Sequence, residues 1–238
     1  MKTILIIISY LIFMQVNGFG QDNFFTDADS FFKKYVKDGK VAYSTLKNNQ
    51  SQLTPLISYI GNATPEDWAT NQKKAFYINA YNLLVISSVV ELYPIKSPLD
   101  SKGFFDEKKH KVAEESLTLN QIENEKLRQE YEDARIHFVL VCAAVGCPKL
   151  MSYAYKPSNI EDLLEKRTKE TLNDPYFIRI SKKNGKLLVS EIFKWYKGDF
   201  LKTHNTVKEY VERYLISSSD LSSYKLGYYA YDWTINAL

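Results

Sequence analysis

The chain lacks the short motifs by which the common enzyme classes are recognised. Its 238 residues contain no His-Glu-x-x-His, no Cys-x-x-Cys and no clustered carboxylates, so no bound metal is predicted. They contain no glycine-rich dinucleotide loop and no Walker-type loop, and no cofactor is indicated. A Gly-x-Ser-x-Gly elbow is also missing, which removes the common serine hydrolase arrangement. A catalytic site in this chain would therefore have to be built from other residues.

Neither charge nor hydropathy points to nucleic acid or to a membrane. The 31 lysines and arginines nearly balance the 28 aspartates and glutamates, so composition offers no case for nucleic-acid binding. Beyond the N-terminus no apolar run is long enough to cross a bilayer, and the chain is not expected to span one. The expected partner is an unidentified peptide or small-molecule ligand.

The first twenty residues have the pattern of a signal peptide. Lys2 is followed by an apolar run that is too short to span a membrane comfortably. Gly18 and Gly20 then occupy the −3 and −1 positions relative to Gln21, the spacing that an export peptidase requires. We expect residues 1–20 to be removed and the protein to be exported, either to a periplasm or to the medium.

No linker, repeat or low-complexity tract divides the rest of the chain, so residues 21–238 predict a single globular domain. The pattern predicts an α+β fold, with N-terminal helices packed on a small, mainly antiparallel sheet. Helices are expected at 24–35, 48–60, 72–93, 159–172, 192–200 and 207–215, and another begins at Thr118 with a capping-box pattern. A hairpin is expected at 176–190, and further strands at 135–142 and 228–235.

The segment with the most chemistry holds both cysteines and one of the three histidines. Residues 135–142 are short and rich in β-branched and aromatic side chains, which favours a strand with Arg135 and His137 on one face. A loop of small residues follows Cys142 and ends at Cys147. A strand that delivers a histidine to a loop thiol can form a nucleophilic site, but it can equally be a strand followed by a disulfide-closed loop.

Glu123 is predicted to lie on the inward face of the helix that begins at Thr118. A buried carboxylate needs a partner, and Arg135 or His137 is the expected one. Such a pair is more often structural than catalytic, and Glu123→Gln would then destabilise the protein.

Asn79 and Asn82 lie three residues apart on the apolar helix 72–93 and therefore share one side. Buried asparagines need several hydrogen bonds, so these two either hold a neighbouring loop or line a cleft and orient a ligand or a histidine.

Four co-linear motifs carry a resemblance to a known family. They are Ala75-Phe-Tyr-Ile-Asn-Ala-Tyr-Asn82, Leu117-Thr-Leu-Asn-Gln-Ile-Glu-Asn124, Arg135-Ile-His-Phe-Val-Leu-Val-Cys142 with Gly146-Cys-Pro148, and Tyr231-Asp-Trp-Thr-Ile-Asn236. Together they resemble the domain of unknown function 547 family, in order from about Lys33 to the C-terminus. The activity of this family is not established, so the resemblance names motif positions but no reaction. Those positions are Asn79, Asn82, Glu123, Arg135, His137 and the turn at 146–148.

Two functions of different classes are compatible with these residues. In the first, the protein is a thiol-type hydrolase or acyltransferase. Cys147 attacks, His137 accepts its proton and Glu123 or Asn79 orients the imidazole, as in cysteine-peptidase and transglutaminase-like folds. Asn79, Asn82 and Arg135 would contact the ligand. This function requires free thiols, and two free thiols are expected because Cys142 faces the core of the predicted strand.

In the second, the protein is a non-catalytic binding or scaffold domain. Glu123, Arg135 and His137 would then form one buried polar network, and a disulfide between Cys142 and Cys147 would close the loop, as export permits.

Overall fold

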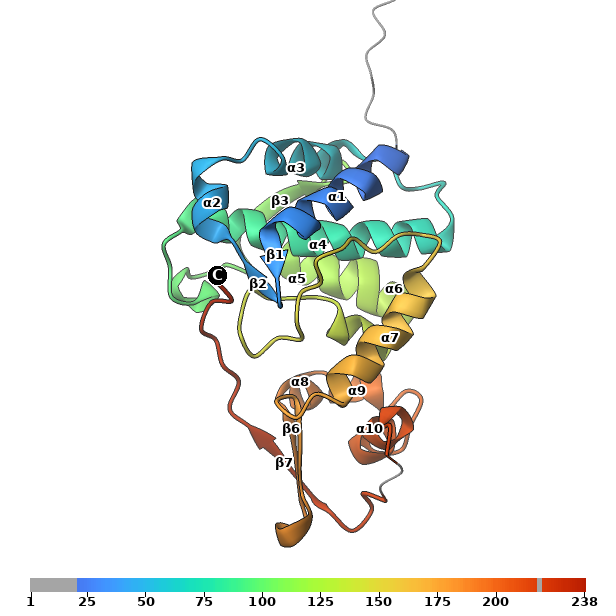
Figure 1. Cartoon of the computed structure of the whole chain (residues 1–238). Coiled ribbons are helices and arrows are strands. Elements are labelled where there is room, and N and C mark those ends of the chain that lie inside the picture. Colours follow the sequence, from blue (N-terminus) through green and yellow to red (C-terminus); the bar gives the residue numbers. More distant parts are fainter. Residues whose placement is uncertain (1–20, 218–219) are drawn as a thin grey trace, which may run out of the picture.

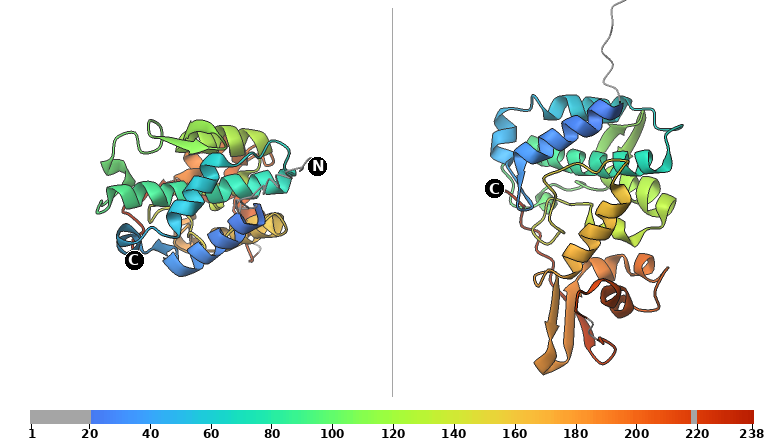
Figure 2. Two further views of the ribbon diagram at one scale, coloured as in Figure 1. Left: turned by 90° about the horizontal axis from the view of Figure 1, so that it is seen from above. Right: turned by 45° about the vertical axis from the view of Figure 1, so that its right-hand side comes forward.

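Helices from the N-terminal part of the chain form one end of the molecule (Figure 1). The computed structural model describes residues 21–217 and 220–238, so the predicted signal peptide lies outside the described residues. The helices at this end are α1 (Gln21–Tyr35), α2 (Tyr43–Asn48), α3 (Leu53–Asn62) and α4 (Thr70–Leu92). Seen from above, α4 crosses the middle of this layer (Figure 2).

The helix α4 is the core of the fold. It is apolar nearly all round, and it packs against α2, α3 and the segment that follows Thr118. Contrary to the expectation from the sequence, this helix is long and apolar enough to cross a membrane, but 83% of its most apolar window is buried inside the protein. It is therefore the central helix of a folded domain, and its predicted limits, 72–93, agree with the structure to within two residues.

The strands form three separate small sheets in the described residues, and this corrects the single sheet that was expected. The strands are β1 (Val36–Lys37), β2 (Lys40–Val41), β3 (Lys109–Val112), β4 (Glu115–Thr118), β5 (Ile178–Ser181), β6 (Lys186–Ser190) and β7 (Lys225–Tyr229). The first two sheets are antiparallel pairs, and in the third β7 joins the β5–β6 hairpin in parallel with β6. The α+β class is confirmed, but the N-terminal helices pack mainly on one another. The third sheet projects from the opposite end of the molecule (Figure 1).

The capping box at Thr118 forms as predicted. The Gln121 backbone N–H donates to Thr118 Oγ1 at 3.1 Å, and the Thr118 N–H donates to the Gln121 side chain at 3.1 Å. The helix that begins here starts as α5 (Leu119–Gln121), widens into a π-helical stretch η2 (Ile122–Arg128), and ends as α6 (Gln129–Tyr131). Glu123 lies in the wide stretch.

The predicted strand at 135–142 is wrong. Residues Ala134–Phe138 form a 3₁₀-helix, η3, and an irregular extended segment follows it. In place of a neighbouring strand, the Asn82 side chain bonds to both Val139 and Val141 of this segment. The β-branched and aromatic residues of this segment are explained by its burial on every side, and not by a strand. Because a 3₁₀-helix has three residues per turn, residues two apart point in different directions, and the two-residue alternation does not hold.

The described C-terminal part of the chain contains four further α-helices and the last strand. Its helices are α7 (Ile160–Leu172), α8 (Ile192–Trp195), α9 (Lys197–Phe200) and α10 (Val207–Tyr214), so the predicted helix 192–200 is two single turns. The last strand, β7, ends at Tyr229, before most of the predicted 228–235. The tail then returns to the N-terminal layer (Figure 2) and pairs with the cysteine loop through Val145 N–H to Thr234 O and Gly146 N–H to Asp232 O, both 2.8 Å.

Candidate functional site

A pocket of about 360 Å³ opens beside the two cysteines. Its wall comes from distant parts of the chain, including α4, η2, η3, α8 and the C-terminal tail. Six of the lining residues are phenylalanine, tyrosine or tryptophan, and the polar part of the lining includes two carboxylates and one histidine. The lining includes Tyr81, Asp106, Glu123, His137, Cys142, Cys147, Trp195, Tyr196, Tyr231 and Trp233.

The cysteine pair forms a disulfide, which corrects the prediction of two free thiols. The loop reverses at Ala143, whose φ is +61°, and the Cα atoms of Cys142 and Cys147 come to lie 6.4 Å apart. This separation is within the range that a disulfide spans. Gly146 is required in the same loop, since a Cβ atom there would lie 2.9 Å from the Asp232 backbone nitrogen.

Two hydrogen-bond donors contact the sulfur of Cys147. The Tyr231 hydroxyl donates to Cys147 Sγ at 2.9 Å, and the Cys142 backbone N–H lies 3.0 Å from the same sulfur. The hydroxyl is also 3.2 Å from Cys142 Sγ. Burial raises the pKa of Tyr231 well above its ordinary value, so the hydroxyl stays protonated and can donate.

His137 is held by a residue that the sequence did not single out, Asp199 of α9. The imidazole Nε2 lies 2.7 Å from Asp199 Oδ2, and the ring stacks on Tyr196 with centroids 4.0 Å apart. The guanidinium of Arg128 bonds to the same carboxylate oxygen at 2.7 Å. Burial alone would raise the pKa of Asp199, but its bonds to His137 and Arg128 outweigh burial and hold it well below its usual range. The aspartate is therefore ionised, and it fixes the orientation of the histidine.

Glu123 is buried, as its position on the helix predicted, but the partner predicted for it is wrong. Its carboxylate accepts hydrogen bonds from the hydroxyls of Tyr81 and Tyr196, and not from Arg135 or His137. The pKa of each of these tyrosines is raised, first by burial and further by the charge of Glu123. In the described part of the chain no lysine or arginine lies within ion-pair distance of Glu123.

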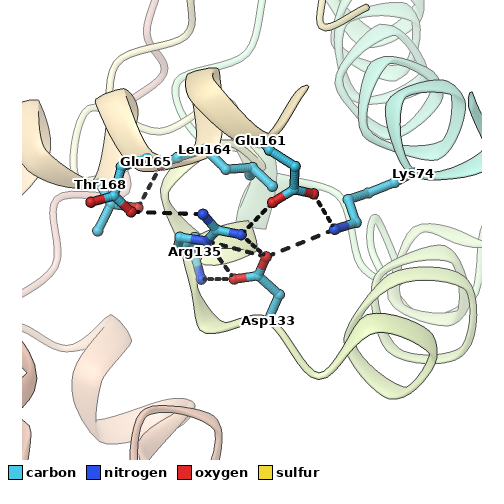
Figure 3. Close-up of polar contacts among 7 residues, drawn as sticks. All are labelled: Lys74, Asp133, Arg135, Glu161, Leu164, Glu165 and Thr168. Atoms are coloured by element: carbon cyan, nitrogen blue, oxygen red, sulfur yellow. Dashed lines mark hydrogen bonds and ion pairs between the residues drawn. The ribbon is translucent and has the colours of Figure 1, made fainter. Parts of the chain in front are cut away.

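Arg135 belongs to a different cluster of charged residues (Figure 3), and it is not among the described residues that line the pocket. Its guanidinium bonds to Asp133 at 2.8 Å and to Glu161 of α7 at 2.6 Å. Lys74 of α4 approaches the same two carboxylates, at 2.7 Å from Glu161 and 3.9 Å from Asp133. The hydrogen bond to Asp133 is the main cause that raises the pKa of Arg135, although burial opposes it. The predicted network of Glu123, Arg135 and His137 therefore does not form.

The two asparagines both bond to loop backbone. Asn79 donates to the carbonyls of Ala75 and Tyr155 and accepts from the Tyr155 N–H. Asn82 donates to the Val139 carbonyl and accepts from the Val141 N–H. Neither is among the described residues that line the pocket. These contacts agree with the interpretation in which the asparagines hold neighbouring loops.

The pocket thus brings together the three predicted catalytic residues, Cys147, His137 and Glu123, but none of the predicted ligand-binding ones. Sequence reasoning missed Asp199 and the aromatic wall. Tyr231 and Trp233 had a signal, because they lie in the fourth family motif. Asp199 had none beyond being an acid between aromatic residues. No group of three or more His, Cys, Asp or Glu in the described residues could hold a metal ion.

A second pocket, of about 590 Å³, shares the Cys147 wall. Its charged residues balance in number: Asp38, Lys40, Lys149, Arg167, Glu170, Asp174, Arg179 and Asp232. Cys147 is therefore accessible to two spaces of different chemistry, one aromatic and acidic and the other with balanced charge.

Comparison with known proteins assigns a family to the central part of the chain. Residues 65–172 match the family described as "Protein of unknown function, DUF547", so the chain carries a domain of this family, as the motifs predicted. The first three motifs lie inside the matched region, and the fourth, at 231–236, lies beyond it. No curated protein and no solved structure matches the chain significantly.

Proposed function

We propose that the pocket is the site of a thiol-type hydrolase or acyltransferase in which Cys147, once reduced, is the nucleophile. The observation that carries the proposal is that Cys147 lines one pocket with His137, while Asp199 holds the other side of the imidazole at 2.7 Å. Cysteine, histidine and an orienting acid are the parts of a cysteine-type catalytic site. Asp199 takes the orienting role that the sequence assigned to Glu123 or Asn79.

The disulfide is the resting form in this proposal. A dithiol reductant transfers two electrons to it, is itself oxidised to a disulfide, and leaves thiols at Cys142 and Cys147. The Tyr231 hydroxyl and the Cys142 N–H then donate to Cys147 Sγ. Hydrogen bonds to the charged form lower the pKa of a thiol, so these donors favour the thiolate.

Catalysis then follows two balanced steps. Because Asp199 occupies Nε2 of His137, Nδ1 accepts the Cys147 proton while Sγ attacks the acyl carbonyl carbon. A thioester forms, and the leaving group departs with the proton from His137. Water, or an acceptor with an amine or hydroxyl, then loses a proton to His137 and attacks the thioester. The C–S bond breaks and Sγ recovers its proton. The second pocket gives the acceptor an approach to Cys147 that is separate from that of the acyl donor.

We also propose that the protein is exported. A disulfide persists in an oxidising compartment, which is where the predicted signal peptide would send the protein. A reductant supplied there would switch the site on.

A non-catalytic binding domain is the second candidate, and the disulfide itself favours it. A Cys142–Cys147 bond without a reducing partner leaves no thiolate, and the pocket would then only bind a ligand.

Alkylation of the reduced protein separates these two functions. After mild reduction, iodoacetamide is expected to modify Cys147 faster than Cys142, with a pH midpoint below the ordinary thiol value of about 8.5. His137→Ala and Asp199→Asn should both remove the advantage. His204→Ala changes a histidine outside the pocket and is the matched control. Slow and equal labelling of both cysteines, with an ordinary pH profile, would refute the enzyme and leave the binding domain.

A further inference from the structure

We propose that the pocket recognises an organic cation, such as an alkylammonium or quaternary ammonium group, with Glu123 as its counter-ion. This inference deepens the proposed function by naming a substrate class. It rests on that function only for the claim that the bound group is a substrate, because binding itself needs no nucleophile.

The first observation is a buried charge without a counter-charge. Glu123 has only 7% of its surface exposed, and its hydrogen-bond donors are the hydroxyls of Tyr81 and Tyr196, which carry no charge. Arg128 senses the charge of Glu123, but its guanidinium bonds to Asp199. A carboxylate withdrawn from water is costly unless a positive charge compensates it. Because this carboxylate lines a pocket, a ligand is the available source of that charge.

The second observation is an aromatic wall of the kind that binds cations. Trp195, Tyr231 and Trp233 pack on one another, with ring centroids 4.9 to 6.0 Å apart. They line the pocket together with Tyr196 and Phe105. The faces of such rings are electron-rich and attract ammonium groups, most strongly where water is displaced. Trp195 is 45% exposed, so it can contact a ligand that enters from solvent.

The sign of charge on the wall supports the same ligand. Asp106 is a second carboxylate in the lining, and among the described lining residues there is no lysine or arginine. An anionic ligand would face both carboxylates. His137 is the one basic group among the described lining residues, and its Nε2 is already bonded to Asp199. The volume, about 360 Å³, lies near the lower limit of small-molecule sites and suits one compact group.

The test uses the disulfide form of the protein and three probes, two cations and one neutral analogue. Choline carries a quaternary ammonium, n-butylamine carries a primary one, and 3,3-dimethyl-1-butanol has the shape of choline without its charge. Binding is followed by tryptophan fluorescence, to which Trp195 and Trp233 contribute from the pocket wall, and by calorimetry. We expect at least one cation to bind at least about tenfold more tightly than the neutral alcohol. The two cations tell a lysine-like group from a choline-like one.

Variants locate the site. Glu123→Gln and Trp195→Ala should each weaken cation binding by about tenfold, while Glu130→Gln, an exposed acid outside the pocket, should leave it unchanged. Melting curves confirm that each variant is folded. Equal affinity for choline and its neutral analogue would overturn the inference. Preferential binding of a neutral sugar such as N-acetylglucosamine would overturn it too.

The outcome is independent of the fate of the nucleophile. Cation binding without a reactive Cys147 supports this inference and refutes the enzyme. A reactive Cys147 without cation binding overturns this inference and leaves the enzyme standing. If both hold, choline or n-butylamine should also protect reduced Cys147 from iodoacetamide.

Discussion

The cluster around Arg135 and the pocket around Glu123 treat buried charge in opposite ways. In the cluster, Lys74 of α4 and Arg135 of η3 meet the carboxylates of three acids, and the charges are paired within the protein. The acids are Asp133, just before η3, and Glu161 and Glu165 of α7. In the pocket, Glu123 is as deeply buried as Lys74, yet only neutral hydroxyls bond to it. A cluster that satisfies itself stabilises the fold, whereas a buried charge left open beside a cavity is available to a ligand.

Breaking the Arg135 cluster should have the largest effect on stability. Arg135→Gln leaves Asp133 without its main partner and weakens the junction between η3 and α7. Since the side chain is about one-fifth exposed, we expect a loss of about 2–3 kcal/mol, below the cost of a fully buried pair. Urea unfolding measures it, with the exposed Arg213→Gln as the control. Cation affinity of the folded variant should not change. A loss no larger than that of the control would show that the cluster is not structural.

Opening the disulfide should have the next largest effect. A bond across five positions of sequence removes loop entropy worth about 2 kcal/mol from the unfolded chain. Cys142→Ser should lose about this much, and it should also leave Cys147 permanently free. The variant should then react with iodoacetamide without prior reduction, while Cys147→Ser should be equally destabilised but inert. Unequal stability of the two serine variants would show that one cysteine has a further structural role.

Removing the charge of Asp199 should cost about 1–2 kcal/mol and change the response to acid. Because the folded-state pKa of Asp199 is lowered, its stabilisation is present above the unfolded value of about 3.9 and is lost as pH falls through the folded value. Asp199→Asn should therefore reduce the acid sensitivity below about pH 4. Urea unfolding from pH 6 to pH 3 measures this. Parallel curves for variant and wild type would mean that Asp199 is not the group responsible.

The smallest stability effect is expected for Glu123→Gln. The sequence-based expectation of a large loss assumed an ionic partner, and no such partner lies among the residues that the structure describes. Glutamine keeps an oxygen that accepts from the Tyr81 and Tyr196 hydroxyls, and it removes an uncompensated charge. We expect a melting temperature close to that of the wild type, although cation binding is weakened. A loss of stability as large as that of Arg135→Gln would show that the charge of Glu123 is as important to the fold as the Arg135 cluster.

Local patterns predicted the elements that local physics controls. The apolar run of α4, the Thr118 capping box and the β5–β6 hairpin, whose turn ends at Gly185 with φ of +55°, all form near their predicted positions. The strand predicted after Asp133 is wrong because the β-branched residues there are buried on all sides. Hydrophobic periodicity cannot distinguish such a buried irregular segment from a strand.

By itself, the sequence determined the α+β class, the family of residues 65–172, and the inward position of Glu123, because helix periodicity and motif spacing are local properties. Only the tertiary structure decided which groups meet. His137 bonds to Asp199, Glu123 to Tyr196, and Arg135 to Glu161. In each pair the two residues lie far apart in the sequence. Side-chain pairing across a fold depends on how helices pack and where loops reverse, as at Ala143, and no local pattern encodes that geometry.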